Sequence, residues 1–154
     1  MKNIWTAAAT AFALAAIVGI PVAAQQSASS FAAARQANYK EIGGAFKTIN
    51  DELRSGSPDM NALRPAAKDV AQRAAMSLKQ FPKGSGPGAG TRTRAKAAIW
   101  KNFADFSKIQ TEMVAAANAL NTAAGSRDIA AMRAARDRLG ATCKSCHDKY
   151  REPS

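Results

Sequence analysis

Apolar side chains recur at alternating steps of three and four residues along four long stretches of this sequence. In the first stretch, the repeating positions are Tyr39, Ile42, Phe46, Ile49 and Leu53. This spacing places about one side chain per turn on a single face of an α-helix. The pattern therefore predicts an amphipathic helix over about residues 30–54, followed by a short Ser/Gly/Pro turn.

The second stretch predicts a helix over about residues 58–80. Its apolar face carries Leu63, Ala67, Val70, Ala74 and Leu78. Ser57 suits the N-cap position and Pro58 the first helical position. Pro65 has no N–H to donate, so we expect it to kink the first turns or to delay the start of the helix. A Phe-Pro pair ends the helix, and residues 83–90 form a Gly/Pro/Ser loop with no packing pattern.

The third stretch is the most regular and predicts a helix over about residues 94–123. Its apolar positions follow a seven-residue repeat and are Ile99, Phe103, Phe106, Met113, Ala117 and Leu120. Gln110 is the polar residue that interrupts this repeat. We expect Gly125 to end the helix, because glycine readily adopts the backbone conformation of a helix C-terminus.

The fourth stretch predicts a helix over about residues 127–151, which starts near Ser126 and has Asp128 in its first turn. One side of this helix carries Ile129, Met132, Leu139, Cys143, Cys146 and Tyr150. Because both cysteines lie on this apolar side, we expect a group attached to them to lie in the core.

Four amphipathic helices with mostly short connections predict an all-α fold. The composition agrees, since alanine is abundant, aromatic residues make up 6% and runs of β-branched residues are absent. We therefore expect an antiparallel up-down-up-down four-helix bundle.

The N-terminus has the features of a secretory signal peptide. Lys2 precedes an uncharged, mostly apolar run over residues 4–24, and Val22-Ala23-Ala24 is a small-residue cleavage site before Gln25. The sequence therefore predicts a signal peptide over residues 1–24 and one domain over residues 25–154. The length of the apolar run leaves an uncleaved N-terminal anchor as the alternative.

The chain is strongly basic, with a formal net charge of +11. Such a charge favours acidic protein partners or anionic membrane surfaces, although a merely solvated basic surface explains it equally well. Export argues against a nucleic-acid partner. We expect a mature protein that is not integral to the membrane.

The chemistry of the chain is concentrated near its C-terminus. Cys143 and Cys146 are the only cysteines, and His147 is the only histidine. Two thiols at this spacing, followed directly by a histidine, can form thioethers with the two vinyl groups of a haem while the imidazole reaches the iron. On a helix all three side chains project from one face. The motif predicts one haem c per chain, buried in the core, with His147 as the axial iron ligand.

Other uses of a Cys-x-x-Cys pair fit less well. A thioredoxin-like dithiol belongs in a βαβ unit, and nothing in this sequence predicts a strand. A zinc site needs four ligands, whereas the chain has three Cys and His residues in total. A disulfide across two residues closes too small a loop to stabilise a fold much.

Four stretches resemble one family, the class II c-type cytochromes, which comprise cytochrome c′ and its low-spin relatives. They are the C-terminal motif in the form Cys-Lys-x-Cys-His-x-x-Tyr-Arg; Arg35-Gln36 with Gly43 two turns on; Phe81-Pro82-Lys83-Gly84-Ser85; and Ile99-Trp100 with Phe106. The resemblance covers essentially the whole of residues 25–154. It implies a periplasmic haem protein, and a homodimer packed through the exposed faces of the first two helices.

The resemblance also implies roles for individual residues. Arg35 and Gln36 would lie on the haem propionate side and Arg151 on the proximal side. Tyr39 stands where low-spin members have an iron-ligating methionine. Because residues 25–54 contain no methionine or histidine, we expect a five-coordinate, high-spin iron, with Tyr39 as a wedge on the vacant face and a potential hydrogen-bond donor to bound diatomics.

Gly43 and Gly44 lie one turn beyond Tyr39. Two glycines inside a helix suggest that a haem face or another helix approaches closely there.

Two functions remain open from the sequence. The first is one-electron transfer, with basic residues guiding an acidic redox partner. The second is binding of a diatomic gas, nitric oxide or carbon monoxide, at an open iron face. We do not expect an enzyme, because the sequence offers no distal histidine or Arg–His pair to cleave a peroxide bond.

Overall fold

The computed structural model of the protein describes residues 22–88 and 91–153. The predicted signal peptide over residues 1–24 lies almost wholly outside this part of the chain, so its cleavage stays a prediction. Within the described residues, no helix is both long and apolar enough to cross a membrane.

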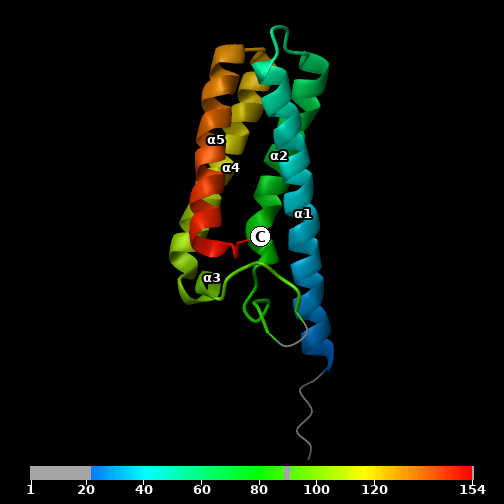
Figure 1. The fold of residues 1–154 in the computed structure, drawn as a ribbon, viewed down its shortest axis with the longest axis vertical. Coiled ribbons are helices and arrows are strands. Elements are labelled where there is room, and N and C mark those ends of the chain that lie inside the picture. Colours follow the sequence, from blue (N-terminus) through cyan, green and yellow to red (C-terminus); the bar gives the residue numbers. More distant parts are fainter. Residues whose placement is uncertain (1–21, 89–90, 154) are drawn as a thin grey trace, which may run out of the picture.

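The structure is helical, and its helices are α1 (Val22–Arg54), α2 (Met60–Ser77), α3 (Ala98–Lys101), α4 (Phe103–Ser126) and α5 (Ile129–Tyr150), with a short 3-10 helix, Leu78–Gln80, directly after α2. The four long helices run side by side along one axis (Figure 1). The connections α1–α2 and α4–α5 lie at one end of the bundle, and α3 with the segment that precedes it lies at the other end (Figure 1). The predicted up-down-up-down four-helix bundle is confirmed.

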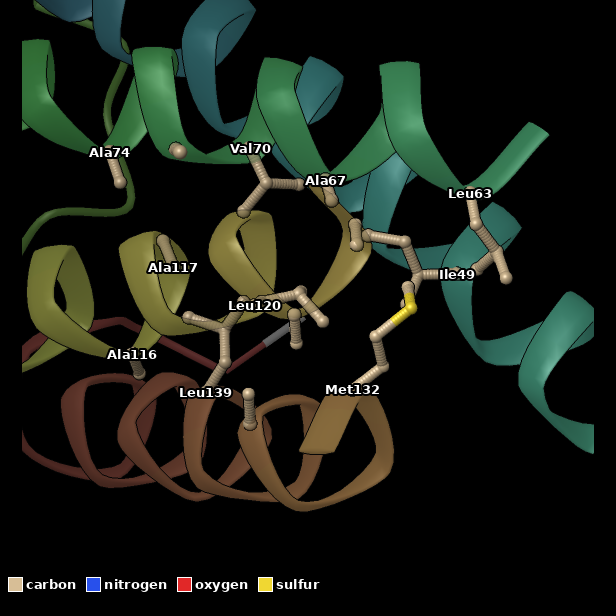
Figure 2. Close-up of a cluster of buried hydrophobic side chains, with 14 of the residues drawn as sticks. Ile49, Leu63, Ala67, Val70, Ala74, Ala116, Ala117, Leu120, Met132 and Leu139 are labelled. Atoms are coloured by element: carbon tan, nitrogen blue, oxygen red, sulfur yellow. The ribbon is translucent and has the colours of Figure 1, made fainter. Parts of the chain in front are cut away.

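The main core lies where all four long helices meet. Figure 2 shows Ile49 of α1, Leu63 of α2, Leu120 of α4 and Met132 of α5 converging between the helices, and each of these side chains is 0% exposed. Four buried alanines, Ala67, Ala74, Ala116 and Ala117, line the same interface. These small side chains let the α2 and α4 backbones approach each other closely. Most of the buried apolar area here therefore comes from a few larger residues.

The helices do not pack equally around the bundle. Helix α1 packs mainly on α2, α2 on α4 and α4 on α5, whereas α1 and α5 touch little. A second cluster of buried residues, Phe81, Ile99, Phe106, Ile109 and Tyr150, lies at the α3 end. The side between α1 and α5 is thus the side on which the bundle can admit another group.

The first two helices start at different residues than predicted. Helix α1 starts by Val22 rather than near residue 30, because residues 22–29 contain no helix breaker, although they lack an apolar stripe that would reveal a helix. Helix α2 starts at Met60 with Asp59 as its N-cap, which accepts a bond from the Asn61 N–H over 2.8 Å. The carboxylate of Asp59 replaces the predicted Ser57 cap, and an acidic N-cap is favourable at a helix N-terminus.

Pro65 neither delays nor ends α2, which runs through it. Its neighbours Leu63 and Ala67 are both 0% exposed. Burial of this apolar face outweighs the one backbone hydrogen bond that the proline removes.

The predicted bounds of the third helix, residues 94–123, are wrong at both ends, because α3 begins at Ala98 and α4 ends at Ser126. Residues 94–96 pair instead with the C-terminal segment, through Lys96 N–H to the Tyr150 carbonyl at 2.9 Å and Glu152 N–H to the Arg94 carbonyl at 2.8 Å. The helix is then interrupted at Asn102, with φ −129° and ψ 55°, which separates α3 from α4. This pairing joins segments about fifty residues apart, so no local pattern could reveal it.

Gly125 does not end α4, which continues to Ser126. The residue with left-handed backbone is Arg127, at φ 59°. Asp128 then caps α5 by accepting a bond from the Ala131 N–H over 2.9 Å. The prediction of a start near Ser126 with Asp128 in the first turn is therefore wrong, because Ser126 still belongs to α4 and Asp128 is the N-cap of α5.

Candidate haem site

A cavity of about 680 Å³ opens between α1, the end of α5, the start of α4 and the segment around residues 92–95. It gathers six of the seven predicted site residues, Arg35, Gln36, Tyr39, Cys146, His147 and Arg151. The seventh, Cys143, is half-buried one turn earlier on α5 and packs against the main core. Residues 35–40 of α1 and residues 146–151 at the end of α5 therefore meet in one cavity.

The cysteines are half-buried free thiols on the last turns of α5. Burial raises the pKa of both thiols, that of Cys146 to about 11. A redox dithiol works through a thiolate with a lowered pKa, so the environment of this pair argues against that use. In the described part of the chain, no cluster of three or more His, Cys, Asp or Glu side chains could hold a metal ion.

His147 lines the cavity from the α5 side. Its Nε2 atom lies 3.3 Å from a terminal nitrogen of Arg151. Partial burial and the Arg151 cation lower the pKa of the imidazole. The neutral imidazole, which is the form that ligates a metal, is thus favoured at this position.

Tyr39 lines the same cavity from α1. Its hydroxyl donates to Oε1 of Gln110 over 3.0 Å, and its ring packs edge-on against Phe81 with centroids 6.4 Å apart. Burial raises the pKa of the phenol well above its usual value, so Tyr39 stays protonated and is a poor iron ligand. Its predicted role at the distal face stays a prediction, although the structure places it on the cavity wall.

Arg35 is 3% exposed and makes contacts that the sequence did not reveal. Its terminal nitrogens donate to the Gln80 carbonyl and to both the hydroxyl and the carbonyl of Ser85, over 2.8–3.0 Å. The guanidinium also lies over Phe81, 4.9 Å from the ring centroid. Most of its donors are thus occupied by the loop after α2, and propionate binding by Arg35 stays a prediction.

The loop after α2 packs against other parts of the protein, contrary to the prediction that residues 83–90 have no packing pattern. Phe81 and Ser85 are 5% and 2% exposed. Gly86 faces the Trp100 ring, where an added Cβ would lie 3.0 Å from the nearest ring atom. The polar and glycine-rich composition hid contacts that are made with Arg35 and Trp100, both distant in the sequence.

Gln36 lies at the cavity mouth, where its side-chain amide donates to the Arg92 carbonyl over 2.8 Å. The mouth also carries Lys40, Arg92 and Arg94. Sequence reasoning missed these cations, although the run Thr91-Arg92-Thr93-Arg94 was a signal, because the segment was assigned to a helix start. Carboxylate groups of a bound cofactor would meet several cations here.

Gly43 and Gly44 are exposed. Among the described residues, no atom beyond their own helix turn lies within 4 Å of a Cβ built at either position. Close helix packing, expected as one explanation for the two glycines, is therefore wrong.

The residues present fit a haem. The imidazole of His147 and the thiols of the motif face one side of the cavity or lie one turn from it. Phe81, Ile99 and Phe106 supply apolar wall. The volume of about 680 Å³ is in the range typical of cofactor sites.

A helical bundle with a terminal Cys-x-x-Cys-His motif at such a cavity defines a c-type haem protein. A family described as Cytochrome C′ matches residues 30–151, and the chain belongs to this family. As in the rest of the family, each chain carries one covalently bound haem c.

Individual relatives agree with this assignment. The chain is 30% identical to cytochrome c′ of Allochromatium vinosum over 98% of its own length and 99% of the relative's. It is 33% identical to cytochrome c-556 of Agrobacterium tumefaciens, over 76% and 93% of the two chains. The crystal structure of cytochrome c′ from Thermochromatium tepidum superposes with a TM-score of 0.77 at 30% identity, covering 82% of this chain and 97% of that one.

Proposed function

We propose that this protein is a periplasmic one-electron carrier whose haem iron is five-coordinate and high-spin. One observation carries the proposal: the cavity that His147 lines from α5 is lined from α1 by Tyr39. Residues 25–54 contain no methionine or histidine that could serve as a sixth ligand. A neutral phenol leaves that side of the iron without a strong ligand.

In this proposal the haem supplies the ferric/ferrous couple, and the protein holds and surrounds it. His147 would ligate the iron, and Cys143 and Cys146 would carry the thioether links to the haem. Phe81 and Phe106 exclude water from one wall of the cavity. Their low polarity influences the redox potential.

The partner we propose is an acidic redox protein that docks at the cavity mouth. Lys40, Arg92, Arg94 and Arg151 all line this mouth, and the chain as a whole has a formal charge of +11. Opposite charge on a partner raises the association rate, and salt screens this effect. We expect Arg92→Glu to slow electron transfer to an acidic redox protein and to flatten its salt dependence. Lys68→Glu, on α2 away from the mouth, is the matched control.

The absorption spectrum of the ferric and ferrous protein tests the proposed iron site. A five-coordinate high-spin haem gives a spectrum distinct from that of a six-coordinate low-spin haem. A low-spin ferric spectrum at neutral pH would show a sixth ligand and contradict the proposal.

Binding of a diatomic gas is the second candidate function. Tyr39 favours this function. Because a neutral tyrosine does not ligate the iron, one coordination position of the iron stays open to a small molecule. A cytochrome c prime from Alcaligenes xylosoxidans, which shares the fold at 23% identity and a TM-score of 0.74, has been solved with bound nitric oxide. Submicromolar binding of nitric oxide without measurable electron transfer to acidic partners would favour this function.

We further propose a homodimer formed through the outer faces of α1 and α2. Met76 on α2 is 50% exposed, which is unusual for a large apolar side chain. A solved cytochrome c′ that is 30% identical to this chain is described as having ligand-controlled dimer dissociation. Sedimentation of the wild type and Met76→Glu tests the proposal, since the variant should shift the population toward monomer.

Export and the absence of an enzymatic activity also belong to the proposal. A signal peptide cleaved after Ala24 would leave a mature chain that begins at Gln25. The mass of the protein purified from the periplasm checks this cleavage. Peroxidase turnover above that of free haem would contradict the non-enzymatic assignment.

A further inference from the structure

Gln110 is the polar residue that interrupts the apolar repeat of α4, and it is 2% exposed. Burying an amide without hydrogen-bond partners costs a few kcal/mol of folding free energy. The contacts of the Gln110 amide therefore explain why the core tolerates it. Its Oε1 lies 3.0 Å from the hydroxyl of Tyr39, and its Nε2 lies 3.9 Å from Sγ of Cys146. One side chain of α4 thus contacts one residue of α1 and one of α5.

Both contacted residues line the haem cavity. Gln110 lies behind them, buried in the bundle. Because α1 and α5 touch little, Gln110 is a direct polar connection between the two cavity walls. Tyr39 therefore has its ring at the cavity and its hydroxyl directed toward α4.

The haem attachment decides which end of the amide faces which partner. A primary amide has a donor end, the NH₂ group, and an acceptor end, the oxygen. Once Cys146 is a thioether, its sulfur carries no proton and is only a weak acceptor, so it can pair with the NH₂ group alone. The amide oxygen then faces Tyr39, whose hydroxyl must donate to it.

We infer that Gln110 is a positioning residue that holds the Tyr39 proton away from the ligand side of the haem. Tyr39 then limits the space at the distal face without donating a hydrogen bond to a bound diatomic. The inference differs from the sequence-based expectation that the Tyr39 hydroxyl is available to such a ligand. The inference rests on the proposed five-coordinate site. It adds that the distal face of this site offers no hydrogen bond from Tyr39 to a bound ligand.

The C–O stretching frequency of the ferrous carbon monoxide complex tests the inference, because a hydrogen bond to the bound ligand lowers that frequency. We expect Tyr39→Phe to leave the frequency unchanged, since the wild-type hydroxyl donates elsewhere. The Ser77 hydroxyl also interacts with Tyr39, so Gln110→Leu is combined with Ser77→Ala to release the Tyr39 hydroxyl, and this variant should lower the frequency. Adding Tyr39→Phe to it should return the frequency to the wild-type value.

Two results would overturn the inference. The first is a higher frequency in Tyr39→Phe, which would show that the wild-type hydroxyl already donates to the ligand. The second is a folded variant with both Gln110→Leu and Ser77→Ala that keeps the wild-type frequency. If that variant fails to fold, the Tyr39→Phe comparison still decides the question.

A second readout does not depend on any ligand. In denaturant unfolding of the holoprotein, Tyr39→Phe and Gln110→Leu should together cost less than the sum of their separate effects, because both remove the same bond. Tyr150→Phe combined with Gln110→Leu is the matched control and should be additive, since the Tyr150 hydroxyl donates to Asp105. Additive effects for the Tyr39 pair would overturn the inference even if the ferric spectrum proved low-spin.

Discussion

Arg35 and Ser85 are fifty residues apart in the sequence and joined by two hydrogen bonds in the fold. One guanidinium nitrogen donates to the Ser85 hydroxyl over 3.0 Å, and the other donates to its carbonyl over 2.8 Å. Both residues are buried, at 3% and 2% exposure. Through this pair, helix α1 holds the loop after α2, the segment whose Phe81 lines the cavity.

Replacing Arg35 should loosen that loop. We expect Arg35→Ala to lower the free energy of unfolding by about 2–3 kcal/mol, because it leaves buried acceptors of the loop without a charged donor. Hydrogen exchange of the amides in residues 81–88 should rise at the same time. Arg138→Lys, at an exposed position of α5, is the control and should change neither quantity. Unaltered exchange in Arg35→Ala would contradict the role of this contact.

The haem should remain bound to the polypeptide through acid–acetone extraction, because thioether bonds are covalent. Cys143→Ala combined with Cys146→Ala should release it completely, and absorbance of the extract measures the released fraction. Each single variant should still retain haem through the remaining thioether. Ser145→Ala, between the two cysteines, is the control and should retain all of it. Quantitative retention by the double variant would disprove the assignment of these residues.

A methionine at position 39 should convert the iron site. Tyr39→Met places a thioether on the cavity wall, so we expect a shift toward the low-spin spectrum of Met–His ligation. Ala37→Met adds the same side chain at an exposed position of α1 and should leave the spectrum unchanged. Tyr39→Ala should speed carbon monoxide binding to the ferrous protein by removing the wedge. A purely high-spin Tyr39→Met protein would mean that position 39 does not face the iron.

Stability at high pH should depend on Tyr150. Its hydroxyl donates to Asp105 over 2.5 Å, and burial together with this bond raises the pKa of Tyr150 from 10.0 to about 12. The folded state therefore holds the phenolic proton more tightly than the unfolded state. This contribution is complete below about pH 10 and is lost between about pH 10 and pH 12.

Denaturant unfolding over that pH range measures the effect. Tyr150→Phe should flatten the alkaline loss of stability relative to the wild type. Lys149→Gln is the control, because it removes the neighbouring side chain that also contacts Asp105 while keeping the Tyr150–Asp105 bond. If Tyr150→Phe loses stability as steeply as the wild type, the titration of this phenol is not the cause.

The same bond acts in the opposite direction at low pH. The hydrogen bond from Tyr150, and then the ammonium group of Lys149, lower the pKa of Asp105 below its ordinary 3.8. A lowered pKa stabilises the folded state above the ordinary value, and this contribution is lost as the pH falls below it. Asp105→Asn should therefore be less sensitive to acid than the wild type in the same unfolding experiment.

The helical bundle and the chemistry of the motif could be predicted from the amino-acid sequence. Both are local properties: apolar steps of three and four residues define a helix face, and Cys143, Cys146 and His147 fall on one side of the last turns of α5. The lack of methionine and histidine in residues 25–54 likewise needs no coordinates. These properties survive because helix periodicity links residues that are neighbours in the chain.

The contacts between distant segments could not be predicted, because they depend on how the helices pack. The pairing of Lys96 with Tyr150 removed a predicted helical turn, and the loop around Ser85 took up the donors of Arg35. The bond from Tyr39 to Gln110 likewise gives the polar residue that interrupts the apolar repeat a partner on the cavity wall. Each of these depends on buried polar groups finding partners, and burial is set by how the helices pack against each other rather than by the residues next to them in the chain.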